Sequence, residues 1–351
     1  MSQHINWPSI EQFRNVVKNV THKAQYRGVD IDGNVIMNRG VIKPKLKFEG
    51  TTKCHGTNSA VVGAFNDGDF NIWYQSRENI ITPIKDNAGF AAFAHHNNEV
   101  FRNLLADAGI MTGAVNPTIA IFGEWCGKGI QKGVAISELP KMFVVFGIAL
   151  VHETGEKTWF TRNEISRLFT AFGELDLLVS GIYHIWQFPT FEMEIDFEHP
   201  ELAQNDLAKL TEQVEAECPV GKALGISNGC GEGIVWRCVE PGWEDSGYWF
   251  KVKGLAHSVT KVKTLALVDI EKVNSIKECV EQICTENRME QIWQKFTDHD
   301  MKIMGAFLKD LAADIFKEEL DTITGSGLNC KEVGKEISNV GRRWFINNLG
   351  E

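Results

Sequence analysis

The pattern of apolar and polar residues divides the chain into two parts. Up to about residue 253, short apolar or alternating runs are typical of strands, which we expect over 45–52, 59–65, 69–75, 119–122, 142–150, 233–238 and 248–253. Apolar residues at helical spacing between these runs predict three helices, over 88–109, 161–172 and 200–217. Beyond about residue 265 the spacing is helical, and the expected helices cover 268–284, 287–320 and 330–348.

These elements predict an α+β fold. A domain of mostly antiparallel sheets with flanking helices would cover residues 1–264, and a small all-helical domain would cover residues 265–351. The length of 351 residues and the hydrophobic content of 43% are sufficient for two domains, each with its own core.

Composition argues against several classes of protein. No run of about 18 apolar residues is present, so we expect no membrane span, and the first residues lack the features of a secretion signal. The eight cysteines are scattered without a Cys-x-x-Cys pair, which argues against a zinc ribbon and favours a reduced, cytoplasmic setting. The net charge of −10 argues against attraction of nucleic acid to the whole surface, although lysines cluster locally at positions 43, 45, 47, 53, 251, 253, 261 and 263.

Five short segments carry candidate chemistry, and each lies on or beside a predicted strand. They contain one potential nucleophile, one arginine, two carboxylates and a pair of lysines, in the segments Lys53-Cys54-His55-Gly56-Thr57-Asn58, Ser76-Arg77, Phe122-Gly123-Glu124-Trp125, Glu232-Gly233-Ile234-Val235 and Lys251-Val252-Lys253. This set suits covalent nucleotidyl transfer, in which a lysine attacks the α-phosphate, cations neutralise the developing charge and a carboxylate holds a divalent metal. The ordinary pKa of lysine is about 10.4, so the amine is almost fully protonated at neutral pH. A nearby metal or cationic side chain would disfavour the charged form and so favour the reactive, unprotonated amine.

The order and spacing of these segments resemble the covalent nucleotidyltransferase superfamily of ATP-dependent polynucleotide ligases and capping enzymes. The resemblance covers about residues 40–260 and is greatest to the RNA ligase 2 family. DNA ligases usually carry Asp two residues after the lysine, where this chain has His55. The helical C-terminal part also resembles that family, whose members have a small helical domain where DNA ligases have an OB-fold.

The resemblance implies an ATP-dependent RNA ligase with Lys53, Glu232, Lys251 and Lys253 as catalytic residues. Lys53 would form the lysyl-AMP phosphoramidate from ATP, Glu232 would bind Mg²⁺ or Mn²⁺, and the lysine pair would contact the α-phosphate. The AMP would pass to an RNA 5′-phosphate and leave when the neighbouring RNA 3′-OH attacks. The expected partner is RNA with 3′-OH and 5′-phosphate ends, in nicks held within a duplex. The expected protein is a cytoplasmic monomer, found in the host cytoplasm if a phage encodes it.

The same resemblance implies a nucleotide-binding set. Besides the catalytic residues, its members are Thr52, His55, Asn58, Arg77, Glu124 and Phe146. Glu124 would accept a hydrogen bond from the ribose 2′-OH, Phe146 would stack on adenine, and Arg77 would bind ribose or phosphate. His55 and Asn58 would contact the nucleotide or position its phosphates.

Several alternatives stay open. Phe143, on the same predicted strand as Phe146, competes as the stacking ring. The family often has Glu and Asp where this chain has Thr52 and Gly147. A DNA ligase or a capping guanylyltransferase is the alternative within the superfamily, and a catalytically inactive nucleic-acid-binding protein is the alternative of another class.

Overall fold

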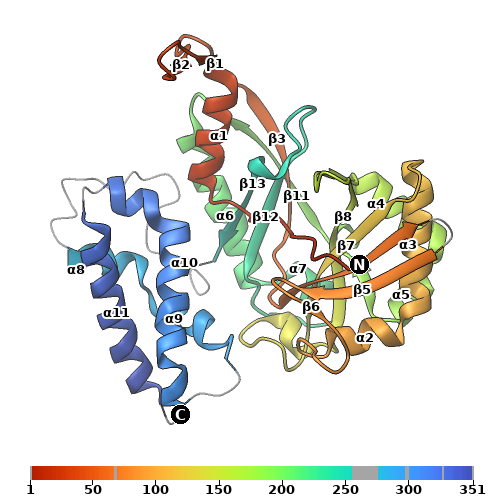
Figure 1. The fold of residues 1–351 in the computed structure, drawn as a ribbon. Helices are drawn as coiled ribbons and strands as arrows, with labels where there is room; N and C mark the ends of the chain where they lie inside the picture. The colour runs from red at the N-terminus through yellow and green to blue at the C-terminus, as the bar shows by residue number, and fades with distance from the viewer. Residues whose placement is uncertain (1, 67–68, 255–275, 297–299, 326–327, 350–351) are drawn as a thin grey trace. The chain divides into compact units, whose positions relative to one another are not determined.

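The computed structural model describes residues 2–66, 69–254, 276–296, 300–325 and 328–349 (Figure 1). The chain divides into two compact units. The first comprises Met1–Ile10, Leu46–Glu194 and Leu210–Lys251, and the second comprises Glu11–Lys45, Ile195–Lys209 and Val252–Glu351. The predicted domain boundary between residues 264 and 265 lies outside the described residues, as do Lys261, Lys263 and the start of the helix expected over 268–284.

The larger sheet of the first unit has the strand order β10-β8-β7-β4-β5-β6, with β9 paired to β8. Its strands are β4 (Thr57–Asn66), β5 (Asp69–Ser76), β6 (Ile80–Ile81), β7 (Thr118–Cys126), β8 (Met142–Val151), β9 (Lys157–Trp159) and β10 (Ile182–His184). Neighbouring strands are antiparallel, except that β10 and β8 are parallel. The sheet therefore supplies the mostly antiparallel core that the strand pattern predicts.

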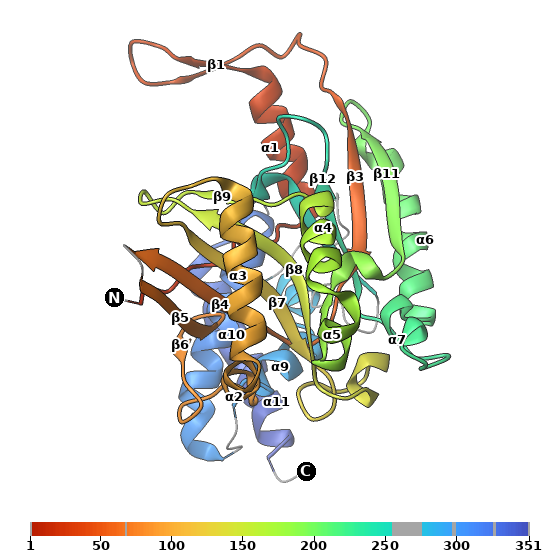
Figure 2. The ribbon, with the colours of Figure 1, turned by 90° about the vertical axis from the view of Figure 1, so that its right-hand side faces the viewer.

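Helices cover one face of this sheet, as Figure 2 shows for α3, α4 and α5 in front of β4, β7 and β8. The covering helices are α2 (Phe90–His96), α3 (Asn98–Thr112), α4 (Arg162–Phe172) and α5 (Glu174–Val179). Strand residues alternate between the two faces, so Ile119 and Ile121 join the helix-covered core, whereas Ala120 and Phe122 face the other way. The opposite face therefore needs another covering layer.

A second, smaller sheet supplies part of that layer. Its strand order is β11-β3-β12-β13, with β3 (Lys45–Thr52), β11 (Thr190–Asp196), β12 (Gly233–Cys238) and β13 (Trp249–Lys253). Trp249 of β13 packs with Ile5, Trp7 and Phe122 in one buried cluster. The two sheets of the first unit thus face each other across an aromatic layer.

The second unit contains α1 (Phe13–Gln25), the hairpin β1 (Tyr26–Val29) and β2 (Val35–Met37), and the helices α8 (Ile276–Ile283), α9 (Glu286–Trp293), α10 (Met304–Gly325) and α11 (Cys330–Asn347). The fully buried Arg288 bonds to Asp314 at 2.7 Å and to Glu319 at 3.4 Å, and Arg14 of α1 bonds to Glu319 at 2.9 Å. These pairings offset the cost of burying the charges and tie α1 to the helices near the C-terminus.

The remaining elements are α6 (Ala203–Ala216), α7 (Pro219–Ala223) and the 3₁₀ turns η1 (Ala135–Glu138), η2 (Ile185–Gln187), η3 (Pro200–Leu202), η4 (Ser246–Tyr248) and η6 (Met301–Ile303). None of the described helices is both long enough and apolar enough to cross a membrane.

The predicted α+β fold class is confirmed, with two differences in detail. The expected helix over 88–109 is two helices, because Asn97 leaves the helical conformation between them and its side-chain amide donates to Phe93 O at 3.0 Å. The expected helix over 287–320 is also two, α9 and α10. Asp300 accepts a hydrogen bond from Lys302 N–H at 2.8 Å and starts the turn η6 that leads into α10.

Candidate active site

Lys53 lies directly after β3, and Glu232 lies directly before β12, the strand that pairs with β3. Its backbone N–H donates to Gly233 O at 2.8 Å, so the antiparallel ladder continues one residue past Thr52. This register brings the two side chains together, and Lys53 Nζ donates to Glu232 Oε2 at 2.7 Å. The Glu232 side chain is 1% exposed and that of Lys53 is 23% exposed, so the carboxylate is shielded while part of the lysine side chain stays in contact with solvent.

His55 contacts the same carboxylate oxygen. Its Nδ1 lies 3.1 Å from Glu232 Oε2 and donates to it when that nitrogen carries the ring proton. A buried carboxylate needs hydrogen-bond donors to offset its lost hydration, and Lys53 and His55 provide two. The structure therefore brings Glu232 together with Lys53 and His55, which belong to a different segment of the sequence pattern.

Glu124 anchors the turn that follows Lys53. The pairing of β4 with β7 places Asn58 opposite Glu124, and Glu124 Oε1 accepts a hydrogen bond from Gly56 N–H at 3.0 Å. A Cβ atom on Gly56 would collide with Trp125 O, so glycine is what allows the turn to approach β7 this closely. The turn is thereby held between β12 and β7, which fixes Lys53 relative to both carboxylates.

The charges of this cluster perturb one another. Burial raises the pKa of Glu124 from its ordinary 4.5 to about 7, with Lys53 opposing the rise and Glu232 adding to it. Burial alone would lower the pKa of Lys53, but the carboxylates of Glu232 and Glu124 outweigh it, so that pKa is raised. The Lys53 amine consequently keeps its proton at neutral pH, because its charged neighbours are carboxylates rather than cations.

Arg77 follows β5, the strand that pairs with β4 on the side away from β7. The pair Ser59 and Ser76 ends this ladder and leaves Arg77 at its edge. Burial lowers the pKa of Arg77, while Glu78 and Glu124 act against that shift. Arg77 in turn helps to lower the pKa of Glu124, so the two groups lie within electrostatic reach of each other.

Phe146 occupies an irregular position on β8. The register between β7 and β8 shifts after Phe122, which leaves Phe146 without a partner in a bulge. Its ring is half-buried and lies 4.6 Å from the ring of Trp7, whereas Phe143 is fully buried in the helix-covered core against Phe90. Of the two candidate stacking rings, Phe146 is the one with exposed surface that a base could cover.

The two departures from the family pattern have identifiable surroundings. Gly147 lies beneath Trp7, and a Cβ atom there would be 2.7 Å from the indole, so a larger residue would displace that ring. The Thr52 side chain is buried, and its Oγ1 has no hydrogen-bond partner among the described residues.

Lys251 and Lys253 both lie on β13 and are half-buried. Because they flank one residue of a strand, they lie on the same face. Lys253 belongs to the second unit, where its Nζ donates to Gln291 Oε1 at 3.4 Å. Their predicted contacts with the α-phosphate therefore remain predictions.

A divalent metal could be held here only with help from a ligand. Within the described part of the chain, no three His, Cys, Asp or Glu side chains are arranged to hold a metal ion. Mg²⁺ is commonly bound by one or two carboxylates together with water and substrate phosphates, and Glu232 could supply one of those carboxylates. The residues therefore fit a metal that arrives with nucleotide phosphates rather than one held by the protein alone.

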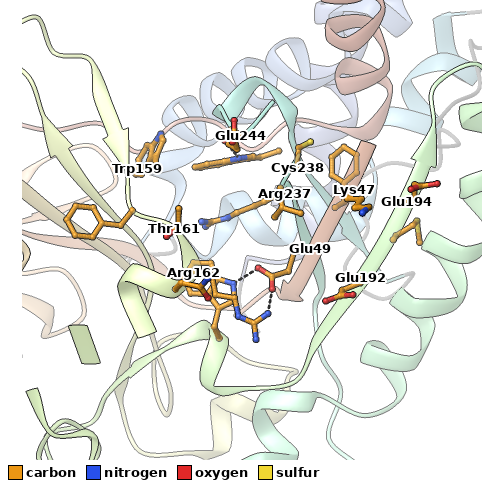
Figure 3. Close-up of a pocket in the computed structure, with 17 residues that line it drawn as sticks. Lys47, Glu49, Trp159, Thr161, Arg162, Glu192, Glu194, Arg237, Cys238 and Glu244 are labelled. Atoms are coloured by element: carbon orange, nitrogen blue, oxygen red, sulfur yellow. Dashed lines mark hydrogen bonds and ion pairs between the residues drawn. The ribbon is translucent and has the colours of Figure 1, made fainter. Parts of the chain in front are cut away.

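A cavity of about 690 Å³ lies beside β3 (Figure 3). Alternation along β3 places Lys47, Glu49 and Lys53 on one face, and the first two line the cavity. Glu49 accepts hydrogen bonds from Arg162 and from Trp186 Nε1, the latter at 2.7 Å. The cavity is therefore walled by paired charges and aromatic rings.

Sequence reasoning missed two residues close to the candidate stacking ring, Arg237 and Trp7. Arg237 crosses the cavity, donates to Phe146 O at 2.6 Å and lies 4.5 Å from the Trp249 ring. Burial lowers the pKa of Arg237 to about 10. An arginine in the middle of an otherwise apolar strand was the available signal for the first residue, whereas Trp7 precedes every segment of the family pattern.

One comparison with known proteins identifies a family for this chain. A family model described as RNA ligase matches residues 46–253. Among solved structures, a mutant of the Naegleria gruberi RNA ligase with AMP and Mn matches with a TM-score of 0.44 and 16% identity, over 72% of this chain and 57% of that chain. The same ligase with PPi matches with a TM-score of 0.43 and 16% identity, over 72% and 57%. Another mutant with ATP and Mn matches with a TM-score of 0.44 and 17% identity, over 73% and 58%.

The chain thus spans less than two thirds of the length of these ligase structures. Among curated proteins, no sequence matches the chain significantly.

Proposed function

The chain belongs to the RNA ligase family, and on this premise we propose that it is an ATP-dependent ligase that joins RNA 3′-OH and 5′-phosphate ends through a covalent lysyl-AMP intermediate. The observation that carries the proposal is the pairing of Lys53 Nζ with Glu232 Oε2 at 2.7 Å, within a turn that Glu124 holds through Gly56. This arrangement holds a partly exposed lysine beside a buried carboxylate.

The first step is attack of the Lys53 amine on the α-phosphorus of ATP. The N–P bond forms as the bond to pyrophosphate breaks, and the amine loses a proton, for which Glu232 Oε2 lies at transfer distance. A metal held by Glu232 together with the nucleotide phosphates would neutralise the phosphate charge. Its positive charge near Lys53 would also oppose the carboxylates that raise the pKa of that amine, which would favour loss of the proton.

The remaining roles follow the chemistry of each side chain. Glu124, once ionised, accepts a hydrogen bond from the ribose 2′-OH, and Phe146 stacks on adenine. Arg77, at the edge of the same site, binds phosphate or ribose. Thr52, His55 and Asn58 complete the set that contacts the nucleotide.

Lys251 and Lys253 are proposed to stabilise charge on the α-phosphate in the transition state. In the second and third steps the AMP moves to the RNA 5′-phosphate, and the RNA 3′-OH then displaces it. The proposed substrate is a nick held in duplex RNA, and the proposed enzyme is a monomer that acts in the cytoplasm.

A sealing assay tests this function. Purified protein is given ATP, magnesium and one of four labelled substrates: nicked duplex RNA, single-stranded RNA, an RNA/DNA hybrid nick or nicked duplex DNA. A parallel reaction offers labelled GTP in place of ATP. We expect sealing of the RNA nick, and loss of sealing in Lys53→Ala. Sealing of DNA nicks alone, or labelling by GTP in place of ATP, would support the DNA ligase or capping alternatives instead. No joining by the wild-type protein on any substrate would favour the inactive nucleic-acid-binding protein.

A further inference from the structure

The N-terminal segment that precedes Ile10 is fixed along β5 of the larger sheet. Ile5 N–H donates to Gln75 Oε1 at 3.0 Å, and Gln75 Nε2 donates back to Ile5 O at 2.5 Å. Trp73 Nε1 donates to Gln3 O at 3.1 Å. These bonds are made by buried or partly buried groups, so the segment has a defined path that delivers Trp7 to the space between the two sheets.

Trp7 is 7% exposed and forms the centre of the aromatic layer. Its ring centroid lies 4.6 Å from Phe146, 4.9 Å from Trp159, 5.1 Å from Phe122 and 5.5 Å from Trp249. The Phe146 contact has the shortest of these distances, and it joins the N-terminal segment to the ring that is proposed to stack on adenine. Tilted aromatic contacts of this kind favour one relative orientation of the two rings.

Two further features hold Phe146 in the same place. Arg237 donates to Phe146 O at 2.6 Å, which fixes the backbone of the bulge. A Cβ atom at Gly147 would lie 2.7 Å from Trp7, so the absence of a side chain there allows the indole to pack directly against the strand. The backbone, the glycine and the indole together leave the Phe146 side chain little freedom.

We propose that Trp7 is a positioning residue for the nucleotide site, which acts by holding Phe146 in the orientation that stacks on adenine. This inference rests on the proposed function, because it assumes that a base binds against Phe146. A side chain that is already ordered loses less conformational freedom when a ligand binds against it. Trp7 therefore strengthens ATP binding without contacting the reacting atoms.

The expected signature is a change in ATP affinity rather than in the chemical step. Ordering of one mobile side chain on binding corresponds to roughly a three- to tenfold change in affinity. Trp7→Leu should raise the half-saturating ATP concentration of single-turnover adenylation by that factor and leave its maximum rate near the wild-type value. Trp7→Phe keeps an aromatic ring and should recover most of the affinity. A purely structural role would instead reduce the fraction of active protein without changing that concentration.

Trp159→Leu is the matched control. Trp159 contacts Trp7, Phe122 and Trp249 in the same layer, but it has no ring contact with Phe146. Its loss should lower the melting temperature as Trp7→Leu does, yet leave the half-saturating ATP concentration unchanged. A second perturbation is Gly147→Ala, which would push the indole away and should raise that concentration in wild type but add nothing in a Trp7→Leu background.

The experiment measures adenylation at a series of ATP concentrations for wild type and these variants, with melting temperatures for each. The proposal is supported if the half-saturating ATP concentration rises in Trp7→Leu and Gly147→Ala, recovers in Trp7→Phe and stays constant in Trp159→Leu. It is overturned if Trp7→Leu and Trp7→Phe both match wild type, or if Trp159→Leu raises that concentration equally. If Trp7→Leu does not fold, Trp7→Phe and Gly147→Ala decide, and the proposal fails if Gly147→Ala has a wild-type half-saturating concentration. Absence of AMP transfer in the wild-type protein would instead overturn the proposed function, and this inference with it.

Discussion

Replacing Glu124 with glutamine should make the protein more stable at alkaline pH while impairing its activity. Burial raises the pKa of this carboxyl from 4.5 to about 7, so the folded protein holds the proton more tightly than the unfolded chain does. Its contribution to stability is therefore greatest below pH 4.5 and is lost as the pH rises through about 7. Glutamine is nearly isosteric, can still accept the bond from Gly56 N–H and carries no charge to desolvate.

The size of the effect follows from the two pKa values. Between pH 5 and pH 8, ionisation of the Glu124 carboxyl lowers the free energy of unfolding of the wild-type protein by about 2–3 kcal/mol, and the glutamine variant does not have this loss. For a unit of about 200 residues this corresponds to roughly 5–10 °C in melting temperature. The melting temperature of Glu124→Gln minus that of wild type should thus be larger at pH 8 than at pH 5 by this amount.

Thermal unfolding of both proteins at the two pH values measures this difference, because titrating groups that do not interact with Glu124 contribute equally to both proteins. Glu99→Gln, at an exposed position in the first turn of α3, controls for the exchange of glutamate for glutamine. Adenylation should fall in Glu124→Gln, since a neutral amide is a weaker acceptor for the ribose hydroxyl. A difference in melting temperature that is the same at pH 5 and pH 8 would refute the reasoning about burial.

Three further outcomes are expected. Lys253→Ala should slow adenylation by roughly two to three orders of magnitude, because a charge contact made in the transition state is worth about 2.7–4 kcal/mol, and the protein should stay folded. Substitution of the exposed Lys302 by alanine is the control, and a near-wild-type adenylation rate in Lys253→Ala would contradict the proposed contact with the α-phosphate. Because the raised pKa of Lys53 keeps the amine protonated at neutral pH in the free protein, its neutral fraction is still growing between pH 7 and pH 9. The adenylation rate at low ATP concentration, which reports on the free protein, should rise over that range, and a flat profile would oppose this. RNA affinity, measured by titration at several salt concentrations, should fall steeply with salt if lysines contact phosphates, and affinity independent of salt would exclude such a groove.

The residues with candidate chemistry could be predicted from the sequence, whereas the residues that hold them in position could not. Lys53 and Glu232 are 179 residues apart, yet each lies where a predicted strand ends or begins, so antiparallel pairing of those strands was enough to bring them together. The RNA ligase family resemblance is likewise confirmed, since its carrying segments lie inside the matched region. Local patterns suffice when a functional residue sits at the end of a strongly patterned strand.

The supporting residues could not be found in this way. The position of Trp7 depends on hydrogen bonds between Ile5 and Gln75, which are 70 residues apart, and such bonds produce no repeating pattern of apolar residues in the sequence. The bulge at Phe146 depends on a register shift within an apolar strand, where one register looks like another. The raised pKa of Lys53 also differs from the expectation of a cation-rich site, because the two carboxylates dominate its surroundings until a ligand binds.

The central claim is that Lys53 becomes covalently attached to AMP, and one measurement tests it most directly. The protein is incubated with ATP labelled at the α-phosphate and magnesium, denatured, and digested for identification of the modified peptide by mass spectrometry. We expect an acid-labile, alkali-stable AMP group on Lys53 that carries the α-phosphate label. ATP labelled at the γ-phosphate should leave no label on the protein, because that phosphate departs with pyrophosphate, and Lys53→Ala should carry no label from either ATP. A wild-type protein that carries no label, or a label that persists unchanged in Lys53→Ala, would contradict it.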